Sequence, residues 1–208
     1  MKSINTFWNW FQDNHHTIGN IFNETPVIQT QTYFWLKKHL NYYCTEIDAM
    51  ILIPKKGSKK AELVITAKGN PDYFSQVIQL VNAAPALRTW KFTAFIQPYE
   101  RIDEMIEELD KPFIFQDITL KTSELKFVGV NFYEDSKKWD IIIFCKQYNI
   151  YCDSKTFYHA INFIIRELLG EKSLYKNINL VHLEQMPDNE EDLIYLYDLQ
   201  AYMDTFKI

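Results

Sequence analysis

Hydrophobic residues follow two spacings along this chain, one typical of helices and the other typical of strands. Apolar residues three and four positions apart predict helices over 3–17, 31–46, 71–84, 155–169 and 190–206. The helix over 71–84 also has a clear start, because Asn70 can accept a hydrogen bond from an unpaired amide and Pro71 lacks an amide at the first helical position. Asp153 or Ser154 can cap the helix that ends before Gly170 in the same way.

Alternation of apolar and polar residues marks the other segments. It predicts strands over these ranges: 47–53, 62–67, 90–97, 125–133, 139–145 and 177–183. A short acidic helix over 100–109 and an extended segment over 112–120 lie between them. The chain therefore mixes helices and strands.

The order of these elements occurs twice. Residues 31–97 run helix, strand, strand, helix, strand, and residues 100–186 follow the same order with one extended insert near 113–120. This pattern predicts an α+β fold in which two halves build one mostly antiparallel sheet with helices packed on it. Extra helices are expected at the N- and C-terminal ends, and the 208 residues are expected to form a single domain.

Several stretches resemble an uncharacterised family of bacterial proteins, a domain of unknown function. They are Phe-Trp-Asn-Trp-Phe at 7–11, the segment 62–70, Val-Asn-Ala-Ala-Pro at 81–85, the segments 90–91 and 94–98, and Leu-Leu-Gly-Glu at 168–171. The resemblance is best over 62–98. It implies a bacterial cytoplasmic origin and one unit rather than separate domains, and it brings no activity, cofactor or catalytic residue.

Charge and cysteine content exclude some classes of protein. The formal net charge of −5 argues against nucleic acid as a partner, since nucleic-acid binding needs a broad basic surface. Three cysteines without a Cys-x-x-Cys pair do not form a disulfide framework, which fits a reducing cytoplasm. The N-terminus does not have the composition of a signal peptide, and no stretch approaches 18 apolar residues, so neither export nor membrane association is expected.

Candidate chemical groups are few. The sequence contains no phosphate-binding glycine loop, no zinc-type Cys/His spacing and no nucleophile motif. The adjacent residues His15 and His16 would point about 100° apart on a helix, which is poor geometry for a shared metal. Cys152 and His159 could form a nucleophilic pair, but a buried or capping role for the cysteine fits its surroundings better. We therefore expect no cofactor, no metal and no catalytic set.

Charged clusters offer a possible interaction surface. The acidic run over 100–110 includes Glu104, Glu107 and Glu108, which suit a basic partner or simply form a solvated helix face. Lys55 and Lys56 lie at the turn between two predicted strands, where they can bind phosphate or discourage edge pairing. In both cases the solvated surface is the interpretation that the composition favours.

Aromatic residues make up an unusual 16% of the chain, and because each buries a large area we interpret them first as core and second as a binding surface. Phe7, Trp8, Trp10 and Phe11 are too many for one narrow stripe of a helix, so some of this surface should stay exposed, with Trp8 and Trp10 as candidates. It can pack against the C-terminal helix or mark a dimer or ligand surface.

These observations predict a non-catalytic cytoplasmic binding or protein-interaction protein, with a homodimer or a protein partner. Two alternatives stay open: a small-molecule binder with a cleft between the two halves, and an immunity-type inhibitor of a basic partner. The hypothesis that the protein is an enzyme has the least support.

Overall fold

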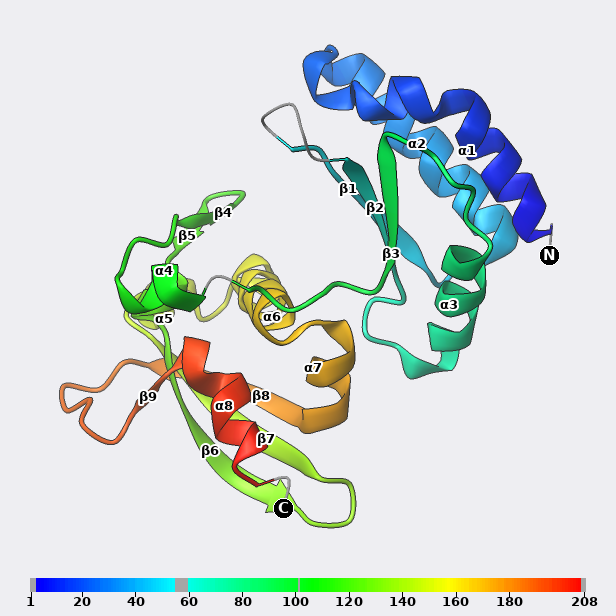
Figure 1. Cartoon of the computed structure of the whole chain (residues 1–208). Coiled ribbons are helices and arrows are strands. Elements are labelled where there is room, and N and C mark those ends of the chain that lie inside the picture. Colours follow the sequence, from blue (N-terminus) through cyan, green and yellow to red (C-terminus); the bar gives the residue numbers. More distant parts are fainter. Residues whose placement is uncertain (1–2, 55–59, 101, 207–208) are drawn as a thin grey trace. The chain divides into compact units, whose positions relative to one another are not determined.

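The computed structural model of the chain describes residues 3–54, 60–100 and 102–206 (Figure 1). The chain divides into two compact units, Met1–Ile96 and Gln97–Ile208. Each unit has its own cluster of buried hydrophobic residues, and the two clusters have no residue in common. The organisation of the whole chain as one domain stays a prediction.

The first unit consists of two long helices followed by a small sheet. Its elements are α1 (Ile4–Gly19), η1 (Ile21–Asn23), α2 (Pro26–Tyr43), β1 (Asp48–Leu52), β2 (Ala61–Thr66), η2 (Pro71–Tyr73), α3 (Phe74–Asn82) and β3 (Trp90–Ala94). β1 and β2 are antiparallel, whereas β2 and β3 are parallel. The segment with α3 makes the crossover that a parallel pair requires.

Local sequence signals explain the start of this crossover. The Asn70 side chain accepts a hydrogen bond from the Asp72 amide at 3.1 Å, as its capping role predicts. The helical turn then buries Val77 and Leu80 against the sheet, while Ile78 stays 38% exposed.

The second unit contains the longer strands. Its elements are α4 (Ile102–Ile106), β4 (Phe113–Phe115), β5 (Ile118–Leu120), η3 (Thr122–Glu124), β6 (Lys126–Tyr133), β7 (Lys138–Cys145), α5 (Tyr148–Tyr151), α6 (Lys155–Leu169), α7 (Glu171–Asn177), β8 (Ile178–Gln185), β9 (Ile194–Tyr195), η4 (Leu196–Asp198) and α8 (Leu199–Asp204). The larger sheet has the order β8-β7-β6-β9, and β4 and β5 form a separate hairpin.

The core of the second unit lies where α6 packs on this sheet. Phe157, Ile161, Ile164, Ile165 and Leu168 of α6 are buried with inward side chains of the sheet. Within the sheet β6 and β7 are antiparallel, and β8 is parallel to β7 after the crossover through α6 and α7. Both units thus contain an antiparallel hairpin, then a helical crossover, then a parallel strand.

Two predictions about the architecture need correction. The single, mostly antiparallel sheet is wrong, because the described strands form three separate sheets and both larger ones are mixed. The final helix over 190–206 is also wrong, since Ile194 and Tyr195 pair with β6 and only Leu199–Asp204 is α-helical. The α+β class is confirmed, and the internal repeat over 31–97 and 100–186 stays a prediction.

None of the helices in the described ranges combines the length and the apolar character needed to cross a membrane.

Candidate functional site

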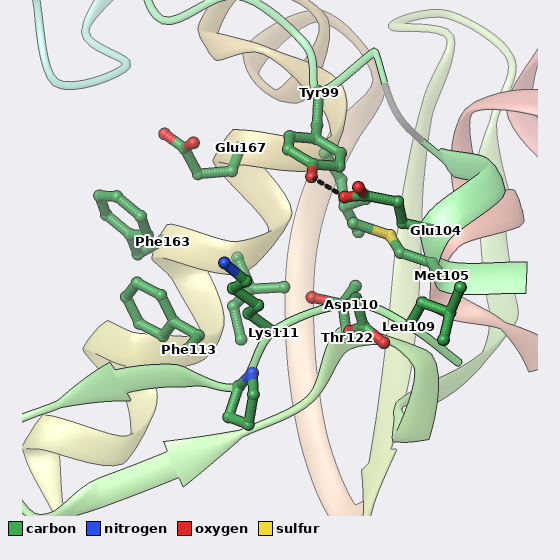
Figure 2. Close-up of a pocket in the computed structure, with 13 residues that line it drawn as sticks. Tyr99, Glu104, Met105, Leu109, Asp110, Lys111, Phe113, Thr122, Phe163 and Glu167 are labelled. Carbon is green, nitrogen blue, oxygen red and sulfur yellow. Dashed lines mark hydrogen bonds between the residues drawn. The ribbon is translucent and has the colours of Figure 1, made fainter. Parts of the chain in front are cut away.

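The second unit holds a pocket of about 420 Å³ between α4, the β4–β5 hairpin and α6 (Figure 2). Phe113 and Phe163 stand on one side of it, and Glu104, Met105 and Leu109 stand on the other. Every residue that lines this pocket belongs to the second unit. The described lining of the site therefore lies within residues 97–208.

The aromatic wall is a stacked pair. The ring centroids of Phe113 and Phe163 are 4.9 Å apart, with an angle of 14° between the ring planes. Phe113 begins β4 and Phe163 lies on α6, so the pair joins the hairpin to the helix. Both rings are only partly buried and present apolar surface to the pocket.

Glu167 lies on the same side of α6 as Phe163, because residues four positions apart are neighbours on a helix. Burial raises the pKa of its carboxyl group, and the adjacent Arg166 guanidinium opposes this shift. No ion pair of Glu167 is found among the described residues. An ionised carboxylate at this position is therefore poorly solvated, which favours a positively charged group beside it.

Two further carboxylates line the pocket. The Tyr99 hydroxyl donates to Glu104 Oε2 at 3.0 Å, as Figure 2 shows. Asp110 is 7% exposed, accepts a hydrogen bond from the Ser123 amide at 3.2 Å and lies 3.8 Å from Lys121 Nζ. The Asp110 contacts fix the chain at the end of α4, so Asp110 has a structural role in shaping this wall.

Lys111 is the one cation among the described lining residues. The described lining residues carry three carboxylates and one ammonium group, so this lining is acidic, and Lys121 Nζ lies 3.8 Å from one of the carboxylates, Asp110. Phenylalanine faces carry partial negative charge and attract cations within about 6 Å of the ring centre. The carboxylates and the aromatic pair therefore favour the same kind of ligand.

Predicted site residues fall in different places. Glu104 lines the pocket, whereas Glu107 and Glu108 are exposed at the end of α4 and do not line it. Lys55 and Lys56 lie outside the described residues.

The expectation that Trp8 is part of an exposed surface is wrong. Trp8 is 3% exposed, and its indole N–H donates to the Leu80 carbonyl at 2.8 Å. Phe7, Trp8 and Phe11 are all buried, so the helix buries a broad face rather than a narrow stripe. Trp10 is half-buried and stacks on His39 of α2, with ring centroids 4.3 Å apart.

Sequence reasoning missed Glu167, Phe113 and Phe163. One signal for Glu167 was present, because this acidic residue stands between Ile164 and Leu168 in the apolar pattern of the helix. The pairing of Phe113 with Phe163 had no sequence signal, since the two residues are 50 positions apart in the chain.

No group of three His, Cys, Asp or Glu side chains within residues 3–54, 60–100 and 102–206 is arranged to hold a metal ion. Comparison of the chain with models of protein families, with curated proteins and with solved structures finds no match.

Proposed function

We propose that this chain is a non-catalytic binding protein and that the pocket of its second unit holds the cationic end of a small organic ligand. The observation that carries the proposal is the partly buried Glu167 carboxylate, which has no described ion-pair partner and lies beside the Phe113–Phe163 stack.

Electrostatics supports a cation over other ligands. A positive group next to Glu167 would replace solvation that burial has removed, and it would lower the raised pKa of that carboxyl. The same group can sit over a phenylalanine ring, where a cation–π contact contributes about 0.5–2 kcal/mol. Among the described lining residues, an anion would face the carboxylates of Glu104 and Glu167 as well as the ammonium group of Lys111.

The size of the pocket supports a small molecule. Ligand sites commonly measure roughly 300–1,000 Å³ and combine apolar walls with a few polar groups. The volume of about 420 Å³ lies in this range, and Met105, Ile164 and Leu168 supply apolar walls. A primary amine with a short apolar or aromatic body matches both features.

A second candidate is an inhibitor of a basic partner protein that inserts a lysine or arginine side chain into the pocket. The rim favours it, because Ile106 and Leu109 are 60% and 67% exposed next to the exposed acids Glu107 and Glu108. Apolar residues ringed by charge are typical of protein interfaces.

The first test is a titration with phenethylamine, with 3-phenylpropionate as the anionic counterpart, followed by calorimetry and by amide chemical shifts. We expect only the amine to bind, with shifts at residues 99–113 and 163–168. Glu167→Gln should weaken binding about tenfold and Phe163→Leu about threefold, from the usual strengths of charge-assisted and cation–π contacts. Binding should strengthen as the pH rises through the raised pKa of Glu167, because the carboxylate form holds the cation.

Matched controls keep this test specific. Glu107→Gln removes one exposed acid directly after α4, and Tyr158→Leu removes one exposed ring of α6. Neither residue is among the described lining of the pocket. The proposal would be contradicted if the amine and the carboxylate bind equally well. It would also be contradicted if the control variants lose as much affinity for phenethylamine as the pocket variants do. The second candidate would instead be supported if phenethylamine does not bind and a short arginine peptide does. Binding of that peptide should then depend on Glu107, Glu108 and Leu109.

A further inference from the structure

The second unit has another cavity, of about 320 Å³, whose charged lining residues are basic rather than acidic. It lies where the β6–β7 hairpin, the end of α7 and α8 come together. Its lining consists of four apolar side chains, two lysines and one amide: Phe132, Trp139, Met203, Phe206, Lys137, Lys176 and Asn177. None of these residues lines the acidic pocket.

Three aromatic rings form its walls. The centroid of the Trp139 ring is 4.9 Å from that of Phe132 and 4.8 Å from that of Phe206. The Trp139–Phe206 pair meets edge to face, with an interplanar angle of 66°, which leaves ring faces directed elsewhere. Phe206 is 44% exposed, so part of this aromatic surface can still be covered by a ligand.

The charged groups at this cavity are both donors. Lys137 Nζ lies 5.8 Å from the centre of the Phe132 ring, and Lys176 lies in the last turn of α7. Neither lysine has an ion-pair partner within 4.0 Å in the described part of the chain, and no acidic side chain is among the described lining residues.

Asn177 adds a buried amide. It is 4% exposed, and its Nδ2 donates to Ser173 Oγ at 2.8 Å, while Ser173 Oγ is 2.7 Å from Gln200 Oε1. An amide nitrogen carries two hydrogens, so a further acceptor can be bound from the cavity. The hydrogen-bond chain to α8 keeps this amide in one place.

We propose that this cavity is a second ligand site, specific for a planar aromatic molecule with an anionic head group. The rings of Phe132, Trp139 and Phe206 cover the aromatic body, and the ammonium groups of Lys137 and Lys176 bind the head group. Opposite charge at the two pockets means that one unit distinguishes two ligands by the sign of their charge.

The test uses 2-naphthoate, with the neutral 2-naphthamide for comparison and 2-naphthyl phosphate as an alternative head group. Trp139 is the one tryptophan of residues 97–208, so its indole N–H signal reports on this cavity, and a Trp139→Phe variant assigns it. We expect 2-naphthoate to shift that signal and to bind at least tenfold more tightly than the amide. Comparison of carboxylate and phosphate identifies which anionic head group the lysines prefer.

Lys137→Gln and Lys176→Gln should each weaken binding of 2-naphthoate about three- to tenfold, and added salt should weaken it further. Lys155→Gln, an exposed lysine at the start of α6 that does not line the cavity, should leave binding unchanged. Both lysines of the site are exposed, so their variants should fold, and thermal unfolding checks this. The proposal is overturned if carboxylate and amide bind alike, if the lysine variants bind like the wild type, or if the Trp139 signal does not move.

Discussion

Asp140 is a buried carboxylate that neutral side chains stabilise. It is 4% exposed and accepts hydrogen bonds from the Tyr133 hydroxyl at 2.7 Å, from Asn179 at 2.8 Å and from Asn131 at 3.3 Å. The Tyr133 hydrogen bond is the largest cause that lowers the pKa of Asp140, and the two asparagines lower it further against the effect of burial. These contacts connect β6, β7 and β8 on one face of the sheet.

The lowered pKa predicts how stability depends on pH. Because the folded-state pKa lies below the unfolded value of about 3.9, this contribution is present above pH 4 and is lost as the pH falls through the lower value. Asp140→Asn should destabilise the second unit at pH 7, since an amide nitrogen would face donor groups. The difference from the wild type should shrink between pH 5 and pH 3 in urea unfolding, on the basis of the same linkage.

The exposed Asp153→Asn variant, which leaves the hydrogen bonds of Asp140 unchanged, serves as the control. A difference between wild type and Asp140→Asn that stays constant across this pH range would contradict the assignment.

Sequence reasoning at this scale succeeded where one residue acts on its neighbours in the chain. Asn70 and Ser154 cap helices as expected, because a cap needs only an amide two or three positions ahead. It failed for Trp8, whose burial depends on the Leu80 carbonyl, 72 positions away. A buried indole needs such a partner, and the sequence does not show which distant carbonyl will supply it.

Among the elements, α6 agrees most closely with its prediction. Ser154 accepts a hydrogen bond from the Phe157 amide at 3.3 Å, and Gly170 ends the helix with a φ of 73°. The left-handed backbone at Gly170 favours glycine, so the stop signal has a direct physical cause. Since Phe163 and Glu167 both lie on this helix, its boundaries also set one wall of the acidic pocket.

Removal of the cap tests this element. Ser154→Ala should lower the free energy of unfolding of the second unit by about 1 kcal/mol, because an amide in the first turn of α6 loses its acceptor. Ser136→Ala, at an exposed position in the turn before β7, is the matched control and should change stability little. Denaturant unfolding measures both, and equal effects of the two substitutions would show that the cap contributes nothing specific.

The C-terminal segment shows why the last predicted helix is wrong. Ile194 and Tyr195 pair with Phe127 and Lys126 of β6, and this pairing takes two residues out of a helical pattern. Tertiary contacts override local propensity here, as they commonly do for short segments. The remaining turn of α8 buries Leu199 and Met203.

At the scale of the whole molecule, the two hydrophobic clusters matter most. One contains residues between Phe7 and Phe95, and the other contains residues between Met105 and Met203. The sequence predicted helices and strands in nearly the right order, but strand spacing says nothing about which strands become neighbours. The parallel β2–β3 and β7–β8 pairs depend on crossovers, so the expected single antiparallel sheet did not form.

Separate clusters predict separate unfolding transitions. Leu40→Ala and Ile141→Ala each remove a fully buried side chain, from the first and second unit respectively, and should each cost about 2–5 kcal/mol. Four of the five tryptophans lie in residues 1–96, so tryptophan fluorescence should report mainly the unfolding of the first unit. Circular dichroism should report the unfolding of both units. Leu40→Ala should shift the fluorescence transition and Ile141→Ala should not, whereas equal shifts in both variants would indicate one cooperative structure.

The parallel pairing of β7 has a consequence for synthesis of the chain on the ribosome. β7 can pair with β6 as soon as residue 145 has left the ribosome. The other edge of β7 stays unpaired until β8, which begins at Ile178, has been synthesised. During that interval the segment Ile141–Ile142–Ile143–Phe144 offers an apolar strand edge to any other nascent chain. Slow translation between residues 145 and 178 should therefore promote aggregation of this protein more than slow translation elsewhere.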